Sequence, residues 1–356
     1  MYNNKITMMK NKPTGSKVLW ITIIATFLIL IVAMGGWICK VYMYDTIGEK
    51  KACIYLTPGL PIDSVCSQLS QYIPPTTAKR VTTLMEYMGY GTEDNERCGY
   101  YELSPTLSIY KAARKLTAGS ETPIRFTFNN LRTKEQLTKR IGDTFYMSPD
   151  SIATLLSDSS VCHSYGFDTT TITAMFIPDT YEFYWTVSPR RFLDRIHYYY
   201  ELFWNDERKQ LAEKTGLSPL EVSVLASIVE EETIKPDEMP VVAGLYINRL
   251  HRGMLLQADP TVKYAVGDFS LRRILAKHLS TDSPYNTYLY VGLPPSPIRI
   301  PSKQALDAVL HYRHHNYLYM CAKDDFSGYH LFASSLQEHN RNAAKYHAAL
   351  NKRNIK

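Results

Sequence analysis

The sequence predicts an α+β protein that consists of an N-terminal transmembrane helix, a small module and a larger, mainly helical domain. An uncharged apolar stretch covers residues 18–39. Short strand and helix patterns then alternate up to about residue 160, and longer helical patterns follow. These observations divide the chain into a tail at 1–17, a transmembrane helix at 18–39, an N-terminal module at 45–160 and a main domain at 161–350.

The apolar stretch predicts a membrane anchor with a defined orientation. Its length of about 22 residues is enough to cross a bilayer as one helix. Lys5, Lys10, Lys12 and Lys17 precede it without any acid, whereas charges of both signs follow it. This bias predicts a cytoplasmic tail at 1–17 and a periplasmic or extracytoplasmic location for the rest, at the inner (cytoplasmic) membrane. A cleaved signal peptide is the alternative, but the stretch is long for one and lacks an A-x-A site.

Composition excludes some classes of function. Hydrophobic residues make up 45% and charged residues 21% of the chain, as in ordinary folded proteins. The net charge of +6 is spread along the chain. Because no Lys/Arg block with interleaved aromatics occurs, we expect no nucleic-acid partner. The six cysteines include no C-x-x-C pair, so one or two disulfides are compatible with the sequence, but their pairing cannot be read from it.

The module begins with a β-α-α-β pattern. We expect a strand at 52–57, helices at 61–72 and 76–88, and a strand at 98–103. A helix at 106–117, a strand at 123–128 and two helices that begin near Thr133 and Ser148 follow.

The main domain begins with a turn at 176–182. Ser188-Pro189 then starts a long aromatic helix, and the next helices are expected from Ser218 and at 241–251. A helix at 304–311, a strand at 317–322 and a C-terminal helix complete the prediction.

The helix that begins after Ser218 carries the most informative acid. Ser218, Pro219 and Glu221 form a start signal with an S-x-x-E capping box. At 100° per residue, the apolar positions form one broad arc with Ser223 and Ser227 opposite. Of the three consecutive acids at 230–232, only Glu232 lies on the arc, roughly 20° from its centre.

A carboxylate on the core side of a helix's last turn has little reason to be there for stability. Burial and the helix dipole both disfavour its charge, so we expect a raised pKa for Glu232, as in a general acid. The alternative is that the helix ends here and leaves Glu232 solvated.

Several polar residues after this helix lie beside apolar runs and Pro turns. They could satisfy buried backbone groups or hydrogen-bond the hydroxyl and acetamido groups of a carbohydrate, and the sequence leaves both readings open. These residues are Asn248, Arg249, Gln257, Asp259, Tyr285, Asn286 and Thr287.

Other chemistries have little support. No nucleophile elbow, phosphate loop or dinucleotide fingerprint occurs, and we expect no cofactor. His311, His314 and His315 form H-x-x-H-H, and a helix would bring His311 and His315 onto one face. Without a third ligand nearby, no metal site is predicted.

Six segments together resemble a known family. LASIVEEET, INRL, LQADPTVKY, YNTY, GLPPSPI and the earlier IPDTYEF look like the signature blocks of the MltG (YceG-like) family, membrane-anchored endolytic murein transglycosylases, and they occur in family order. The resemblance covers about 165–345 and implies a YceG-like catalytic domain, while the module at 52–103 is similar to the family's LysM-like subdomain. Ser296, Ser302, Tyr312 and Met320 depart from the family pattern, which affects loop geometry rather than chemistry.

The resemblance implies that Glu232 is the catalytic acid. It would protonate the β-1,4 bond between N-acetylmuramic acid and N-acetylglucosamine and then, as carboxylate, take a proton from the muramoyl C6 hydroxyl to leave a 1,6-anhydro end. The polar residues given above are the binding candidates, and Glu182 is a candidate second acid. Cutting nascent glycan strands near the membrane would terminate their elongation, so peptidoglycan synthases (penicillin-binding proteins) are expected partners.

Two other functions remain open. A non-catalytic peptidoglycan-binding scaffold would keep the fold but would not need Glu232. A hydrolase would use water and a second carboxylate, either Glu182 or Asp259, and would leave reducing ends.

Overall fold

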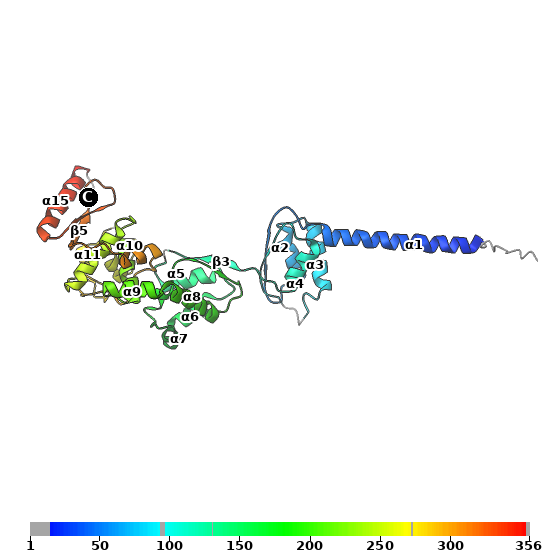
Figure 1. Cartoon of the computed structure of the whole chain (residues 1–356), viewed down its shortest axis with the longest axis horizontal. Coiled ribbons are helices and arrows are strands. Elements are labelled where there is room, and N and C mark those ends of the chain that lie inside the picture. The colour runs from blue at the N-terminus through cyan, green and yellow to red at the C-terminus, as the bar shows by residue number, and fades with distance from the viewer. Residues whose placement is uncertain (1–14, 93–96, 130, 272, 354–356) are drawn as a thin grey trace, which may run out of the picture. The chain divides into compact units, whose positions relative to one another are not determined.

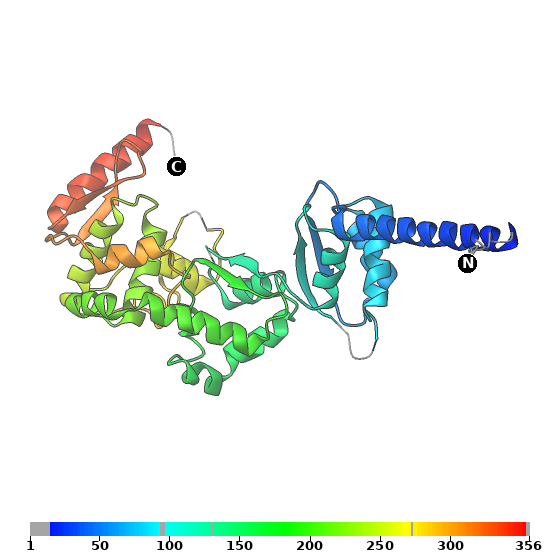
Figure 2. The same ribbon diagram turned by 45° about the vertical axis from the view of Figure 1, so that its right-hand side comes forward.

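The computed structural model describes residues 15–92, 97–129, 131–271 and 273–353. The chain divides into two compact units, Met1–Pro123 and Ile124–Lys356 (Figures 1 and 2). Helices and antiparallel strand pairs occur in both units, which confirms the mixed helix-and-strand class. Most of the tail predicted at 1–17 lies outside the described residues.

The smaller unit is built on one antiparallel strand pair covered by helices. β1 (Ala52–Leu56) pairs with β2 (Gly99–Leu103), with α2 (Ile62–Ser70) and α3 (Pro75–Tyr87) between them in the chain and α4 (Ile109–Thr117) after them. This order confirms the predicted β-α-α-β pattern. Apolar residues from all five elements form its core, among them Ile54, Leu56, Val65, Leu69, Ala78, Val81, Met85, Tyr101, Leu103, Ala112 and Leu116.

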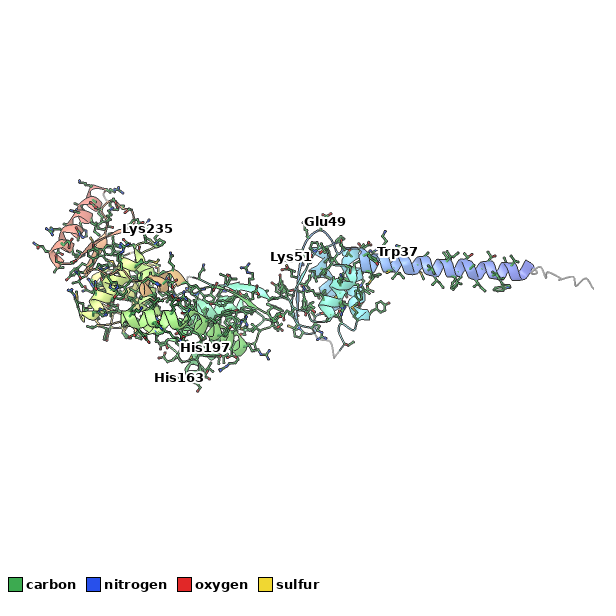
Figure 3. The ribbon with its side chains drawn as sticks, in the orientation of Figure 1. Trp37, Glu49, Lys51, His163, His197 and Lys235 are labelled. Atoms are coloured by element: carbon green, nitrogen blue, oxygen red, sulfur yellow. The ribbon has the colours of Figure 1, made fainter. Side chains whose placement is uncertain are left out.

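The N-terminal apolar stretch forms one long helix. α1 (Gly15–Cys39) continues into a π-helical turn, η1 (Lys40–Tyr44). Every side chain from 18 to 40 is exposed, and Trp37 is one of them (Figure 3). Among the described residues, Val18–Tyr44 alone is helical, long and apolar enough to cross a membrane.

The larger unit begins with a second strand pair and an aromatic core. β3 (Ile124–Thr127) pairs antiparallel with β4 (Thr180–Phe183). Around them lie α5 (Lys134–Gly142), α6 (Pro149–Ser157), α7 (Ser159–Ser164), the 3-10 helix η2 (Ile172–Met175) and α8 (Pro189–Phe203). Phe126, Phe145, Phe183 and Phe192 pack together with ring centroids 4.8–5.8 Å apart.

Two expectations for this region differ from the structure. The turn predicted at 176–182 contains most of β4, because Tyr181 and Phe183 alternate with exposed residues and point into the core. The module predicted to end at residue 160 ends earlier as a compact unit, at Pro123. The reason is that α5 and α6 place Leu137 and Ile152 in the same core as β4.

The rest of the larger unit surrounds a buried central helix, α10 (Pro219–Glu232), which packs against α9 (Asp206–Thr215), α11 (Met239–His251), α12 (Asp259–Val266) and α14 (Lys303–Leu310). α13 (Ala276–Leu279) precedes α14. β5 (Tyr319–Ala322) pairs with β6 (His330–Ala333), and α15 (Leu336–Lys352) packs against both strands. α9, α12, α13 and β6 were not predicted.

The cysteines form no disulfide. All six have free thiols, so the one or two bridges that the sequence allowed are not formed.

Candidate active site

The central helix begins as its sequence predicts. The Ser218 hydroxyl accepts a hydrogen bond from the Glu221 amide at 3.3 Å, and the Glu221 carboxylate accepts one from the Ser218 amide at 2.8 Å. This capping box satisfies amides that the first turn would otherwise leave without a partner. The prediction of Ser218, Pro219 and Glu221 as a helix start is therefore confirmed.

The helix is more deeply buried than a one-sided apolar arc suggests. Ser223 and Ser227, expected opposite the arc, are both buried. The Ser227 hydroxyl donates to the carbonyl of Val224 at 2.7 Å and accepts from the amide of Ile298 at 3.0 Å. These contacts hold α10 in place one turn before its three C-terminal acids.

The first two of the three acids are held by arginines. Both oxygens of Glu231 accept hydrogen bonds from Arg132 at 2.8 Å, and Arg299 donates to Glu231 at 2.7 Å. Glu230 lies 3.5 Å from Arg299 and accepts from the Ser302 amide at 2.9 Å. These contacts leave Glu230 and Glu231 in structural ion pairs.

Glu232 has a different hydrogen-bond partner from its two acidic neighbours. Its carboxyl oxygen accepts a hydrogen bond from the Tyr246 hydroxyl at 2.7 Å, and the residue is half-buried. It lines a cavity of about 220 Å³ between α10, α11 and the β5–β6 pair. The lining residues are Glu232, Leu245, Tyr246, Arg249, Leu256, Gln257, Asp259, Tyr288, Met320, Cys321, Ala322 and His330.

The surroundings tune this carboxyl group toward neutral pH. Burial, with a smaller contribution from the negative charge of Asp259, raises the pKa of Glu232 to about 7, against the lowering effect of the Tyr246 hydrogen bond. At neutral pH the group is therefore shared between its acid and its carboxylate form. The expectation of a raised pKa agrees with this geometry, and the solvated alternative does not.

Three of the predicted binding residues line the cavity: Arg249, Gln257 and Asp259. Arg249 is buried, and its guanidinium donates to the carbonyls of Leu318 at 2.6 Å and Leu256 at 2.8 Å. Asp259 accepts from the Tyr288 hydroxyl at 2.6 Å. These contacts hold Arg249 and Asp259 in place in the cavity wall.

Gln257 stands in a left-handed backbone conformation, with φ of 50°, which costs a non-glycine residue about 1 kcal/mol or more. Thr287 holds it there, because its carbonyl accepts from the Gln257 amide and its hydroxyl accepts from the Ala258 amide, both at 3.0 Å. Thr287 is thus a buried support for the cavity wall and not part of its lining.

The other predicted binding residues lie outside the cavity lining, and two of them bond the backbone. The Asn248 amide donates to the carbonyls of His315 and Tyr317, and the buried Asn286 amide donates to those of Leu279 and Thr281. The Tyr285 hydroxyl bonds Ser296 at 2.6 Å. Glu182 lies on the exposed face of β4, outside the cavity lining.

Eight of the twelve lining residues were not predicted as site residues, and those with a phenol or imidazole group are Tyr246, Tyr288 and His330. Tyr246 directly precedes the INRL block and Tyr288 is the last residue of the YNTY block. In the sequence, nothing distinguishes them from the other tyrosines, of which the chain has 27 in all. His330 lies on the unpredicted strand β6. A prediction that a second strand pairs with the strand at 317–322 would have placed His330 beside the cavity.

The histidine cluster has a structural explanation. α14 ends at Leu310, so His311 and His315 do not share a helix face as expected. His315 bonds the Val241 carbonyl through Nε2 at 2.9 Å and packs against α11. Within the described residues, no three His, Cys, Asp or Glu side chains are grouped so that they could hold a metal ion.

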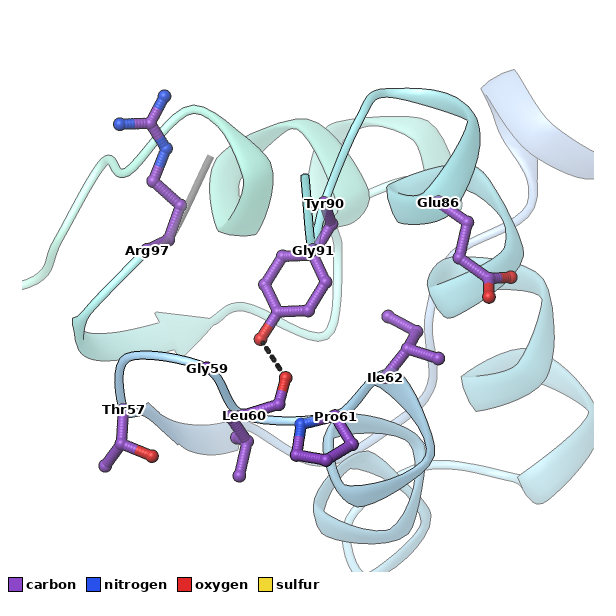
Figure 4. Close-up of a pocket in the computed structure, with 9 residues that line it drawn as sticks. All are labelled: Thr57, Gly59, Leu60, Pro61, Ile62, Glu86, Tyr90, Gly91 and Arg97. Carbon is purple, nitrogen blue, oxygen red and sulfur yellow. Dashed lines mark hydrogen bonds between the residues drawn. The ribbon is translucent and has the colours of Figure 1, made fainter. Parts of the chain in front are cut away.

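A second cavity lies in the smaller unit (Figure 4). It measures about 330 Å³ and is framed by the loop from Thr57 to Ile62 on one side and by Tyr90 and Arg97 on the other. The Tyr90 hydroxyl donates to the Leu60 carbonyl at 3.0 Å across it. Its lining carboxylate, Glu86, is exposed, so this cavity lacks the desolvated acid of the cavity around Glu232.

Comparisons with known proteins relate the chain to one family of similar sequences and structures. The model of the YceG-like family matches residues 54–345. An endolytic murein transglycosylase of Bacillus subtilis is 26% identical over 336 residues, which cover 86% of this chain and 88% of that protein. Another of the same name, from Streptococcus pneumoniae, is 26% identical over 90% of this chain and 64% of its own length. The crystal structure of a YceG-like protein from Listeria monocytogenes has a TM-score of 0.55 and 25% identity, covering 82% of this chain and 98% of that one.

Proposed function

The chain belongs to the YceG-like family, and on that premise we propose that it is a lyase, a membrane-anchored endolytic peptidoglycan transglycosylase. Its substrate is a glycan strand, which it cuts at the β-1,4 bond between N-acetylmuramic acid and N-acetylglucosamine. The observation that carries the proposal is the Glu232 carboxyl, whose pKa of about 7 suits both proton donation and proton removal.

In the first half of the reaction, protonated Glu232 gives its proton to the glycosidic oxygen. The bond from C1 of the muramoyl residue to that oxygen breaks with its electron pair leaving on the oxygen. Positive charge then develops at C1 while Glu232 becomes a carboxylate. The Tyr246 hydroxyl, at 2.7 Å, stabilises this carboxylate by donating to it.

In the second half, the Glu232 carboxylate removes the proton of the muramoyl C6 hydroxyl, and O6 forms a bond to C1. The products are a 1,6-anhydro end and a free 4-hydroxyl. The proton that Glu232 gave stays on that 4-hydroxyl, and the proton from the C6 hydroxyl restores the acid form of Glu232. No water is consumed, so the cavity needs one acid rather than the acid and base pair of a hydrolase.

The cavity wall supplies the groups that orient the sugar. Arg249, Gln257, Asp259 and Tyr288 lie around Glu232 and offer both donors and acceptors to hydroxyl and acetamido groups. We assign a structural role to four residues outside the cavity lining, namely Asn248, Tyr285, Asn286 and Thr287. Glu182 has no part in this mechanism.

The anchor places the enzyme where new strands appear. We propose that α1 spans the inner (cytoplasmic) membrane with the N-terminus in the cytoplasm and both folded units outside. The β-α-α-β unit at 52–103 is then a LysM-like module. Cleavage of nascent strands near the membrane would terminate their elongation, with penicillin-binding synthases as partners.

The test is digestion of purified peptidoglycan by the full chain in water enriched in ¹⁸O, followed by mass spectrometry of the released fragments. A transglycosylase gives internal fragments with unlabelled anhydro ends. Reducing ends that carry ¹⁸O would mean hydrolysis, with Asp259 as the second carboxylate of the cavity. Absence of any cleavage, on nascent strands as well, would favour the non-catalytic scaffold.

A further inference from the structure

A buried carboxylate outside the cavity is tied to one of the cavity's walls. Glu238, just before α11, is 4% exposed and accepts three hydrogen bonds. Two come from His330, from its amide at 2.7 Å and from ring Nδ1 at 2.9 Å. The third comes from the hydroxyl of Thr233, the residue after Glu232, at 2.8 Å. Glu238 therefore joins the end of α10 to β6.

The ring that Glu238 holds belongs to the catalytic cavity. His330 lines the cavity together with Glu232, and its side chain is 16% exposed. Burial alone lowers the pKa of His330, but the hydrogen bond and charge of Glu238 outweigh it and raise that pKa above the ordinary value. When Nδ1 donates to Glu238, a second proton that the ring binds resides on Nε2.

We propose that Glu238 is a positioning residue that fixes the His330 imidazolium in the cavity wall, as counter-ion to the carboxylate that Glu232 becomes after it donates its proton. This inference rests on the proposed transglycosylase mechanism and adds to it an electrostatic partner from a distant segment. The His330 cation stabilises the carboxylate form of Glu232, which is present between bond breaking and ring closure.

Other charged and titratable groups face Glu232 as well. α11 contributes the Tyr246 hydroxyl and Arg249, and α12 contributes Asp259 and Lys263. The other titratable side chains of the lining are those of Tyr288 and Cys321. Asp259 raises the pKa of Glu232, whereas His330 and Lys263 lower it. Lys235 is directed to a different partner, with its ammonium 4.8 Å from the centroid of the Tyr329 ring.

If His330 acts as a counter-ion to Glu232, its removal shifts the pH profile of kcat/KM in a defined direction, which the loss of a purely structural contact would not do. Protonated Glu232 starts the reaction, so kcat/KM falls as pH rises through its pKa. Removing the cation of His330 raises that pKa, and the basic limb of the pH profile moves to higher pH. An opposite charge nearby commonly shifts a pKa by about one unit or more, so we expect a displacement of about one pH unit.

The experiment compares full-length variants in detergent on uncross-linked glycan strands, by the rate of anhydro-end formation from pH 5 to 9. His330→Gln and Glu238→Gln should each move the basic limb up by about one unit, the second because His330 without Glu238 loses its charge. His330→Lys keeps a cation and should return the limb toward the parent position. His311→Gln, an exposed histidine outside the cavity, is the matched control and should leave the profile unchanged.

The inference is overturned if His330→Gln and Glu238→Gln lose rate with a basic limb that superimposes on the parent's. Thermal unfolding identifies a variant that fails to fold. In that case, the His330 ring is titrated by NMR in the folded parent, and a ring already neutral at pH 7 would equally overturn the inference. Failure of the proposed function is distinguishable, because the parent itself would then form no anhydro ends.

Discussion

The hydrogen bond from Tyr246 to Glu232 makes a quantitative prediction for Tyr246→Phe. The phenyl ring fills the same buried space, so the change removes only the hydroxyl that donates to the carboxylate at 2.7 Å. A hydrogen bond to a charged group contributes about 1.5–3 kcal/mol, and one pKa unit corresponds to about 1.4 kcal/mol. The pKa of Glu232, about 7 in the parent, should therefore rise by about one to two units.

The assay is kcat/KM for anhydro-end formation as a function of pH. The basic limb should move to about pH 8–9, and the maximal rate should fall because Glu232 becomes a weaker proton donor and its carboxylate loses a stabilising partner. A limb that stays at the parent position, or that moves to lower pH, would refute the view that Tyr246 stabilises the carboxylate of the catalytic acid. Tyr264→Phe serves as control, since Tyr264 packs on Tyr285 outside the cavity lining.

Three further predictions follow from the same contacts. Glu232→Gln should stabilise the folded protein above pH 7 by up to about 3 kcal/mol, because the pKa of Glu232 is raised from 4.5 to about 7 on folding. The folded state then holds a proton that the unfolded chain has released, so the parent loses stability as pH rises from about 4.5 to 7. Thermal unfolding at pH 4 and pH 8 checks that the difference exists only at the higher pH. Asp259→Asn should lower the pKa of Glu232 and move the basic limb to lower pH, and an upward shift would contradict the charge assignment. Ser227→Ala should lower the free energy of unfolding by about 1–3 kcal/mol, because the buried Ile298 amide loses its acceptor; an unchanged denaturation midpoint would show that this amide finds another partner.

Local signals in the sequence predicted much of the fold. The capping box at Ser218, the helix start at Ser188 and the short strand patterns of β1 and β2 depend on residues close together in the chain. β6 escaped prediction because a four-residue strand has too little pattern by itself. The compact units of the structure could not be read from local patterns, because the pairing of β3 with β4 joins residues 124–127 to residues 180–183 across a long stretch of chain.

The candidate site was predicted unevenly for a similar reason. The direction of Glu232 follows from helical geometry, so the sequence could single it out from its two acidic neighbours. The polarity of Asn248 or Asn286 says nothing about whether the partner is a ligand or a backbone carbonyl, and in both cases it is the backbone. Tyr246 and His330 meet Glu232 only after α11 and β6 have packed beside α10.

The most direct test of the central claim uses the three consecutive acids as their own controls. Rates of anhydro-end formation would be measured for the full chain and for Glu230→Gln, Glu231→Gln and Glu232→Gln. We predict that Glu232→Gln loses about 10²-fold to 10⁴-fold or more in rate. Glu230→Gln and Glu231→Gln, which disturb the ion pairs with Arg132 and Arg299 and the hydrogen bond from the Ser302 amide, should keep most of the parent rate in their folded fraction. A Glu232→Gln variant that still forms anhydro ends at the parent rate would contradict the assignment of Glu232 as the catalytic acid.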